Sequence, residues 1–469
     1  MKIRSIKTLF FFIALGFLFT PINVDAQSAQ NKKPIKYKKA RALQATTAKK
    51  MAKVYEAIDR VNEEGEPDPD MQTVLNILNE LLADKENLKS YDRSVMWNAW
   101  AYVYYTEERY EKAIETYKKL VNEPEVTIGL RLTGLLYLGQ LHMIQEVPDY
   151  KKTIEYLLQW QGEVEKVTAQ SHAILGQAYY ESKQYRNSLN SIEKAVDLAE
   201  VEGYKPKESW YTLMAAGIEE LKDEIGKEKA ILRQIDIYEI LVNLYPKKDY
   251  FLRLGGRYMQ LGREKDYMIT LKAAHAKDLL NKENEYLTLA QLLLLSKNPY
   301  WAAEVITSGQ KKMITQVDEK TKEEKIVPVI KNTEKNLKLL GDSWRMAQEI
   351  DKAIPVLEES AKLSKKGESY VLLGNLYLSE DKVKKAIDAI NKGLKKGGID
   401  NLSQVNLTLG QAHFELQKFE DAKKYFRVAA RDKDKKIKTQ ANNWIKYTEN
   451  EEVRVKNLAM RRDFIQNSG

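Results

Sequence analysis

The stretch that decides the fold is residues 97–117, WNAWAYVYYTEERYEKAIETY. In this stretch Ala101 is small and stands among large apolar side chains. A second small residue, Ala113, follows twelve positions later, and Tyr117 follows sixteen positions after Ala101. The polar segment at residues 107–110 separates two runs with helical periodicity. The spacing therefore predicts two antiparallel helices whose backbones approach closely at the small residues, while the aromatic rings fill the space beside them.

The same spacing recurs along the chain in eight units. In each unit a small residue, here called the anchor, follows a large apolar residue, and successive anchors are mostly 33–41 residues apart. A ninth, degenerate unit at residues 210–246 has Met214 in the small position. The anchors of the eight clear units are Ala101, Gly139, Gly176, Gly255, Ala290, Gly341, Gly374 and Gly410.

This pattern resembles the tetratricopeptide repeat family, because the units of Ala101, Gly374 and Gly410 match its small and bulky positions residue by residue. The resemblance implies an all-α fold, a solenoid or superhelix of about nine to ten helix pairs. Two units depart from the pattern. The unit of Gly139 has two extra residues in its loop. The unit of Gly255, which is the fifth when the degenerate unit is counted, has Tyr267 where a small residue is expected, so we expect that helix pair to splay or shift.

The first 26 residues have the composition of a secretory signal peptide. Basic residues precede an apolar run at residues 9–19, and Ala26 is a small residue suited to cleavage. The run is shorter than the roughly 17–25 residues of a membrane-spanning helix. We expect cleavage after Ala26 and export to the periplasm, with an uncleaved anchor as the alternative. The absence of Cys fits an exported protein and argues against thiolate chemistry.

The net charge of +9 is unevenly distributed. Residues 1–26 carry +2 and residues 27–55 carry +9, which leaves −2 for everything that follows. The basicity is therefore that of an N-terminal arm at residues 27–55 that runs into the first helix, and it does not predict a nucleic-acid partner. The arm could contact a membrane or an acidic partner. The alternative is an arm that only contacts water.

The ends of the chain predict irregular units. Residues 40–90 form an expected first helix pair, with Asp70 capping its second helix. The repeat array spans residues 91–435, and residues 436–469 are expected to form a capping helix and tail, with Trp444, Ile445 and Val453 on its inner face.

One insertion interrupts the repeat array. Fifty-one residues separate Ala290 from Gly341, and the excess falls at residues 311–331. Its β-branched segments flank a polar stretch, which predicts a small hairpin or a loop, with Pro328 confining its strand to an edge. The insertion is either a tolerated surface feature or an element that docks a partner.

No motif in the sequence predicts catalysis. There is no HExxH, no GxSxG and no Gly-rich phosphate loop, and His142 and His413 replace an aromatic residue of the repeat. The sequence therefore predicts a protein that is not an enzyme, with no catalytic residue, no cofactor and no metal site. A hydrolase within the degenerate unit, dependent on Glu219 or Asp223, is the alternative.

The resemblance implies that the first helices line a concave groove, which binds peptides in that family. The positions next to the anchors are rich in amides, which both donate and accept hydrogen bonds and could bind an extended backbone. Tyrosines add contact area near the N-terminal end. Amides that merely contact water are the alternative. The predicted partner-binding residues are Asn98, Tyr102, Tyr105, Gln140, Gln177, Tyr180, Gln291, Asn375 and Gln411.

The sequence thus predicts a periplasmic scaffold that binds proteins or extended peptide segments. An exported leader, a basic arm and a nearly continuous array make the chain similar to the repeat proteins that accompany TonB energy-transduction systems. This similarity implies a TonB-type protein or its outer-membrane transporter as partner. An envelope-assembly adaptor for peptidoglycan or outer-membrane biogenesis proteins is the main alternative.

Overall fold

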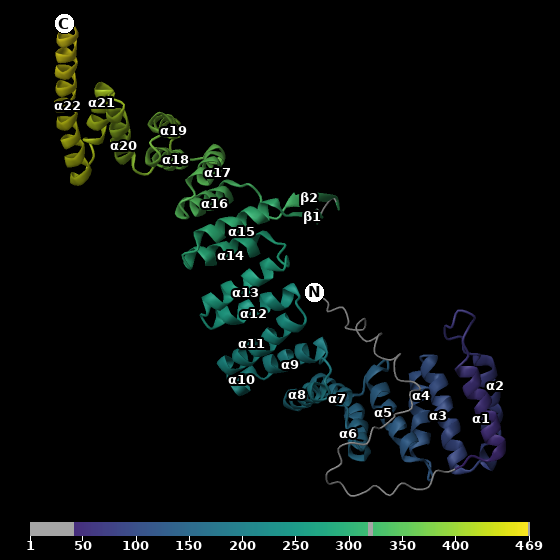
Figure 1. The fold of residues 1–469 in the computed structure, drawn as a ribbon. Helices are drawn as coiled ribbons and strands as arrows, with labels where there is room; N and C mark the ends of the chain where they lie inside the picture. The colour runs from purple at the N-terminus through teal and green to yellow at the C-terminus, as the bar shows by residue number, and fades with distance from the viewer. Residues whose placement is uncertain (1–41, 318–321, 468–469) are drawn as a thin grey trace. The chain divides into compact units, whose positions relative to one another are not determined.

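The computed structural model describes residues 42–317 and 322–467, so the expected signal peptide and residues 27–41 of the arm lie outside the described residues. The chain divides into two compact units, which meet in sequence at Lys166 and Val167. Each unit is built from helical hairpins that follow one another along the chain (Figure 1). The all-α repeat architecture predicted from the sequence is confirmed.

The first unit contains three hairpins, and a short 3-10 helix at Lys85–Asn87 precedes the second. Asp70 caps α2 as predicted, since its side chain accepts a hydrogen bond from the backbone N–H of Thr73. The helices are α1 (Ala45–Ile58), α2 (Met71–Ala83), α3 (Ser90–Thr106), α4 (Tyr110–Val121), α5 (Ile128–Ile144) and α6 (Tyr150–Glu163).

The second unit continues the same arrangement and closes with one long helix. Its hairpins are α7 (Ala169–Glu181) with α8 (Tyr185–Val201), α9 (Glu208–Glu220) with α11 (Lys227–Leu244), α12 (Lys248–Gln260) with α13 (Glu264–Ala276), α14 (Glu283–Leu295) with α15 (Pro299–Lys311), α16 (Glu334–Met346) with α17 (Ile350–Leu363), α18 (Glu368–Ser379) with α19 (Val383–Lys396), and α20 (Leu402–Glu415) with α21 (Phe419–Ala429). A short α10 (Lys222–Ile225) interrupts the second of these hairpins, and α22 (Lys435–Asn467) follows the last.

In the regular hairpins that have a glycine anchor, the two helices come into close contact at that glycine. A Cβ atom added to Gly374 would lie 2.4 Å from Cγ1 of Ile390, sixteen positions later, and 3.1 Å from the carbonyl oxygen of Ala386, twelve positions later. Gly176, Gly341 and Gly410 meet the residue sixteen positions later in the same way. The two helices therefore touch at the small residues, because no space for a further side chain remains between them.

The two irregular units depart at this contact. Gly139 meets Leu157, eighteen positions later, which accounts for the two extra residues in its loop. Gly255 meets the ring of Tyr267, twelve positions later, where the other hairpins have a small residue, so a large side chain stands between the two helices at this contact.

The turn inside seven of the hairpins, including that of Gly255, has a fixed geometry. Seven positions after the anchor, a residue adopts a left-handed conformation, and the next backbone N–H donates to the carbonyl of the residue three positions after the anchor. This pattern closes the first helix with a Schellman-type bond. The left-handed residues are Glu108, Lys183, Gly262, Lys297, Gln348, Asp381 and Gln417.

The insertion forms a hairpin of two antiparallel strands, β1 (Met313–Val317) and β2 (Glu324–Pro328), with Met313 paired to Pro328. Most of its residues are exposed, but the chain that leaves it is not. Ile330 is fully buried, and its side chain packs on Gly309 of α15. The insertion therefore returns to the core by filling the space beside a small residue of the preceding helix.

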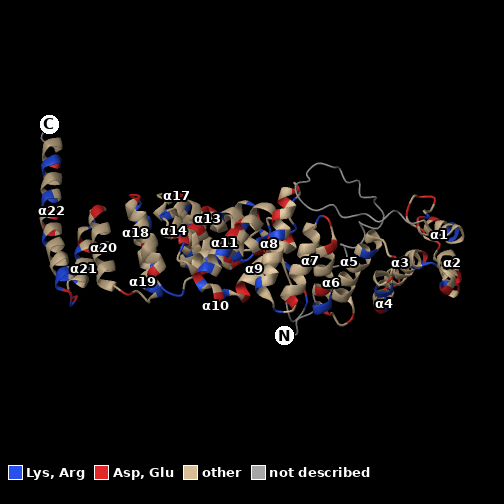
Figure 2. Ribbon diagram, turned by 90° about the horizontal axis from the view of Figure 1, so that it is seen from below, with Lys and Arg blue, Asp and Glu red and all other residues tan. Residues whose placement is uncertain are grey.

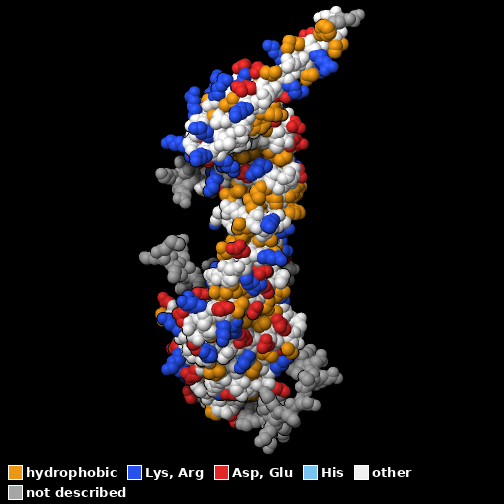
Figure 3. All heavy atoms as spheres, turned by 90° about the vertical axis from the view of Figure 1, so that its left-hand side faces the viewer, with side chains coloured by type: hydrophobic (Ala, Val, Ile, Leu, Met, Phe, Trp, Pro, Cys, Tyr) orange, Lys and Arg blue, Asp and Glu red, His pale blue; other side chains and the backbone are white. Residues whose placement is uncertain are grey.

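One expectation for the last helix, the position of Val453 on its inner face, is wrong. Ala441 and Thr448 are buried and Trp444 packs on Phe426, but Val453 is 58% exposed and does not belong to the inner face. The helix continues past its contacts with α20 and α21, and apolar side chains near its end lie uncovered beside basic ones (Figure 3). None of the described helices is long and apolar enough to cross a membrane.

The first unit repeats an ion pair at one position of two successive hairpins. Arg93 at the start of α3 pairs with Glu123 after α4, and Arg131 at the start of α5 pairs with Glu163 at the end of α6. The second pair is bidentate, with nitrogen–oxygen distances of 2.7 and 2.8 Å. Each pair closes the open end of its hairpin, opposite the turn.

Replacement of Gly374 by Ala is expected to destabilise the chain by about 1–3 kcal/mol, because the added Cβ collides with Ile390 and with the backbone of Ala386. Urea denaturation measures the change. Gly256→Ala is the matched control, since a Cβ at this helical position meets nothing within 4 Å, and there the higher helix propensity of Ala predicts equal or greater stability. Equal effects of the two substitutions would contradict the close approach.

Glu163→Gln is expected to lower stability at neutral pH by about 1 kcal/mol. The two hydrogen bonds from Arg131 hold the pKa of Glu163 below its ordinary value of 4.5. The wild-type pair therefore stabilises the fold above pH 4.5, and this contribution is lost as the pH falls through the depressed pKa.

Urea midpoints of wild type and Glu163→Gln should therefore differ at pH 7 and converge in acid. Glu155→Gln on the same helix is the control, since Glu155 forms an exposed pair with Lys152. A difference between wild type and Glu163→Gln that persists below the depressed pKa would mean that packing, and not charge, explains the effect.

Candidate functional site

The nine predicted partner-binding residues all lie on the first helices of their hairpins, and none is buried. Four belong to the first unit: Asn98, Tyr102 and Tyr105 on α3, and Gln140 on α5. Five belong to the second unit: Gln177 and Tyr180 on α7, Gln291 on α14, Asn375 on α18, and Gln411 on α20. The residue after each anchor is thus accessible, although the anchor itself is not.

The tyrosines of the first unit form a cluster. The ring of Tyr105 lies 5.9 Å from that of Tyr137 and 6.3 Å from that of Tyr110, and Tyr137 stacks on Tyr117 at 5.1 Å. Burial raises the pKa of Tyr105 and of Tyr137, so both hydroxyls stay protonated at neutral pH. This cluster offers rigid aromatic surface and hydroxyl groups to a partner.

The amides differ in how they are used. The side chain of Gln177 donates to Glu181 of its own helix at 2.6 Å, so it is already engaged. The side chains of Gln291 and Asn375 are exposed. The face of the first helices therefore presents amides at regular intervals, but the structure gives no contact that joins them into one ladder.

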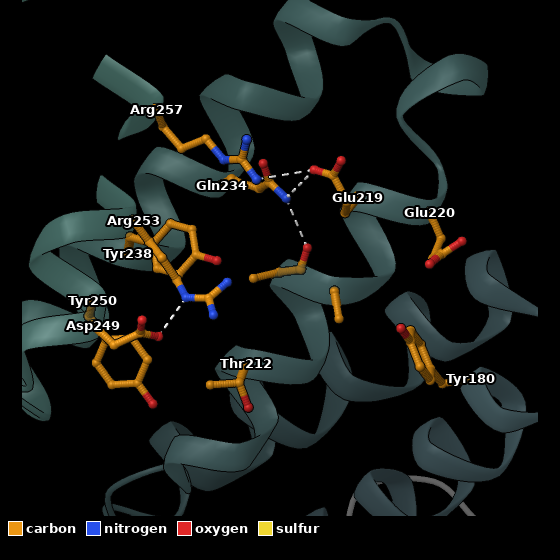
Figure 4. A pocket seen from close by; sticks show the side chains of 12 residues that line it. Tyr180, Thr212, Glu219, Glu220, Gln234, Tyr238, Asp249, Tyr250, Arg253 and Arg257 are labelled. Carbon is orange, nitrogen blue, oxygen red and sulfur yellow. Dashed lines mark hydrogen bonds and ion pairs between the residues drawn. The ribbon is translucent and has the colours of Figure 1, made fainter. Parts of the chain in front are cut away.

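A cavity of about 430 Å³ opens in the second unit, where first helices of three hairpins meet. Tyr180 of α7, Glu219 and Glu220 of α9, and Arg253 and Arg257 of α12 line it (Figure 4). Of the nine predicted residues, only Tyr180 is among those that line it.

The charged groups of this cavity are mostly paired. Arg253 donates to Asp249 at 2.6 Å, and Arg257 lies 3.1 Å from Glu219. Glu219 also accepts from Lys222 at 2.7 Å, and this bond, with the contacts of Gln234 and Arg257, holds the pKa of Glu219 below its ordinary value. Elsewhere, Lys, Arg, Asp and Glu are interspersed along the helices (Figure 2).

Gln234 also lines this cavity, and it lies on α11, the second helix of its hairpin. Its side chain is 1% exposed, and its amide nitrogen donates to the carbonyl oxygen of Ala215 at 3.0 Å and to Glu219 at 3.2 Å. Its amide oxygen has no hydrogen-bond donor among the described residues. The side chain of Gln234 therefore holds one fully buried acceptor without a donor among the described residues.

The degenerate unit requires a correction of the sequence register. Met214 is only partly buried, whereas Ala215 is buried against α11 and occupies the small position. The shift by one residue places Glu219 four positions after its anchor, where Tyr105 and Tyr180 also stand.

This shift explains which residues the sequence reasoning missed. With Met214 as anchor, the equivalent of Tyr180 would be Ile218, which is fully buried. Glu220 and the two arginines beside Gly255 carry no motif of their own. With the correct register of α9, the sequence could have predicted that Glu219 lies at the accessible position that Tyr105 and Tyr180 occupy in their own hairpins.

The two acids named for a hydrolase do not meet in this cavity. Glu219 lines it and is held ionised by its hydrogen bonds to Lys222 and Gln234 and by the nearby charge of Arg257, whereas Asp223 of α10 does not line it. Within the described part of the chain, no three His, Asp or Glu side chains converge where they could hold a metal ion.

Comparison with known proteins identifies the repeat. The tetratricopeptide repeat family model matches residues 95–123, 169–201, 367–395 and 403–430. The chain therefore carries tetratricopeptide repeats, as the sequence predicted, and repeats of this class make it a scaffold for protein–protein interaction. No curated protein matches it.

Three solved structures are similar to part of this chain. A crystal structure of MamA is 20% identical with a TM-score of 0.31, covering 39% of this chain and 97% of MamA. The TPR2AB-domain:pHSP90 complex of yeast Sti1 is 11% identical with a TM-score of 0.28, covering 61% of this chain and 98% of that one. The Cut9–Hcn1 structure is 13% identical with a TM-score of 0.26, covering 76% and 90%.

Ala215→Leu is expected to destabilise the second unit by about 1–3 kcal/mol, because Ala215 is buried in the apolar core of that unit and a larger side chain overpacks it. Met214→Leu at the adjacent position conserves volume and should have a smaller effect. Urea denaturation compares the two. A larger loss for Met214→Leu would restore the register first expected from the sequence.

Proposed function

We propose that this chain is a non-enzymatic periplasmic adaptor that binds extended segments of partner proteins along its first helices and assists TonB-dependent transport. The observation that carries the binding mode is the repeated placement of an accessible side chain directly after a buried anchor. Gly176 and Gly374 are each in contact with the second helix, whereas Gln177 and Asn375 are accessible. A partner can therefore meet one polar side chain from each of several hairpins.

The cellular location rests on the sequence of residues 1–26, whose basic start, short apolar run and Ala26 suit cleavage and export. A TonB-type protein or an outer-membrane transporter is the partner implied by an exported leader, a basic arm and an almost unbroken array. The arm at residues 27–55 would add electrostatic attraction to an acidic partner or to anionic lipid.

In-cell crosslinking tests this proposal. A photoreactive amino acid at Gln140 or Gln177 is expected to capture a TonB-type protein or an outer-membrane transporter, because both positions face the binding side of their helices. Asp197, an exposed residue on the second helix α8, is the matched control and should capture little. Mass spectrometry identifies the adducts.

Capture of a peptidoglycan or outer-membrane biogenesis protein would favour the envelope-assembly alternative, and equal capture from all three positions would contradict a specific groove. Deletion of the gene separates the two roles independently. The TonB role predicts impaired uptake of iron chelates with normal envelope permeability, whereas the assembly role predicts the reverse.

A further inference from the structure

The long helix α22 is covered by the rest of the second unit only along its first part. Lys423 of α21 still pairs with Glu452 at 2.7 Å. Beyond Val455 every described residue of α22 is exposed, and the helix runs on past α20 and α21 (Figure 1). Leu458 and Ile465 are 39% and 61% exposed. This part of α22 therefore presents apolar side chains that no other described part of the chain covers.

The sequence of this part has the seven-residue period of a coiled-coil seam. Glu451, Leu458 and Ile465 are seven positions apart, and Val455 and Arg462 stand four positions after the first two of them. Side chains that alternate at intervals of four and three lie along one side of a helix. We call these five residues the α22 seam.

The α22 seam continues a contact that the fold already uses. Earlier in the helix, Trp444 stacks on Phe426 of α21, and Thr448 is fully buried. The intervals of four and three run without a break from Trp444 through Thr448 to Glu451. The seam is therefore the extension of a helix–helix interface, and another helix is the partner whose shape matches it.

The charges of the seam select a second copy of the same helix. In an antiparallel pair with its twofold axis between residues 456 and 457, Glu451 of each copy lies opposite Arg462 of the other. Val455 then lies opposite Leu458. A parallel pair would place Glu451 opposite Glu451 and Arg462 opposite Arg462, so the repulsion of like charges disfavours it.

The present partner of Glu451 does not prevent this pairing. Arg454 of the same helix donates to both carboxylate oxygens of Glu451, at 2.5 and 2.7 Å. Each carboxylate oxygen has two lone pairs, so Glu451 can accept from a second cation as well. The side chain of Arg462 is exposed, so it is accessible to another molecule.

The last residue of the seam also finds an apolar contact. In the antiparallel pair, Ile465 of one copy comes beside Tyr447 of the other. The side chain of Tyr447 is 54% exposed, and it lines an open groove of about 270 Å³ with Gln440, Asn443 and Trp444. An aliphatic side chain against this ring would bury apolar surface on both copies.

A lipid surface fits this part of α22 less well. A helix that lies on a membrane has one apolar face and one polar face. Here Val453, Met460 and Phe464 are exposed on the side opposite the seam, so apolar side chains lie on two sides of the helix. The seam also contains the carboxylate of Glu451, which would be costly to bury in lipid.

We infer that this chain forms an antiparallel dimer through the α22 seam, with Glu451 and Arg462 paired twice across the twofold axis. The overlap of residues 451–465 is about 22 Å long. The contact is therefore small, and we expect a dissociation constant on the order of micromolar. The inference goes beyond the proposed function, because it does not depend on which protein the first helices bind.

Sedimentation velocity of the full-length chain tests the inference. The wild type should change from monomer to dimer as its concentration rises to roughly 100 µM. Leu458→Glu should weaken dimerisation at least about 10-fold, because it places a carboxylate opposite Val455 of the other copy. Val453→Glu is the matched control, since it changes an exposed apolar residue on the opposite side of the same helix and should leave the dissociation constant unchanged.

Exchange of the seam charges tests the pairing itself. Glu451→Arg and Arg462→Glu should each weaken dimerisation about 3- to 10-fold, because like charges then face each other. The double variant should recover the wild-type dissociation constant, since the pair is present again in reversed order. Loss of helical structure in α22 would not be recovered in this way, and circular dichroism of each variant measures it.

Several results would overturn the inference. They are a wild type that stays monomeric throughout this range, equal effects of Leu458→Glu and Val453→Glu, and a double charge exchange that does not restore the dimer. Flotation with phosphatidylglycerol vesicles tests the membrane alternative. If the wild type is monomeric and binds the vesicles while Leu458→Glu does not, α22 docks on a lipid surface and the dimer is wrong.

Discussion

The close approach of paired helices at a small anchor is the constraint on which the rest of the structure depends. At Gly374 the backbone of the facing helix comes within 3.1 Å of where a Cβ would stand. This contact fixes which side of the first helix faces its partner, and therefore which residues remain accessible. Gly374 faces the second helix and is buried, so its neighbour Asn375 points to another side of α18 and is exposed. The fold and the binding face are two results of one packing rule.

Much of the fold could be predicted because this rule leaves a periodic mark in the sequence. The small anchor, the bulky residue sixteen positions later and the cap at Asp70 are local features, and each is found where the sequence placed it. The rule also predicted its own exceptions, since the extra loop residues after Gly139 and the ring of Tyr267 both alter the contact. The signal peptide and the role of the arm stay predictions.

The candidate site was harder to predict because it lies in the unit that follows the rule least closely. Met214 and Ala215 are adjacent, and the burial of Ala215 together with the hydrogen bond from Gln234 to its carbonyl oxygen decides between them. A polar residue such as Gln234 at a contact between helices does not add to the apolar periodicity from which helices are predicted. The short α10 also changes the spacing between α9 and α11, so the position of the anchor could not be read from that spacing. Glu219 of α9 and Arg257 of α12 belong to neighbouring hairpins. The spacing of residues within one repeat unit therefore cannot show that they form an ion pair.

The turns carry a further consequence. Of the seven left-handed turn positions seven residues after an anchor, Gly262 is the one glycine, and the other six hold side chains in a conformation that disfavours them. Each of these six turns holds a small amount of backbone strain close to the anchor, where the two helices leave no room for a larger side chain. Directed stabilisation of this chain could therefore begin at its turns, one repeat at a time, and leave both the helix contacts and the binding face untouched.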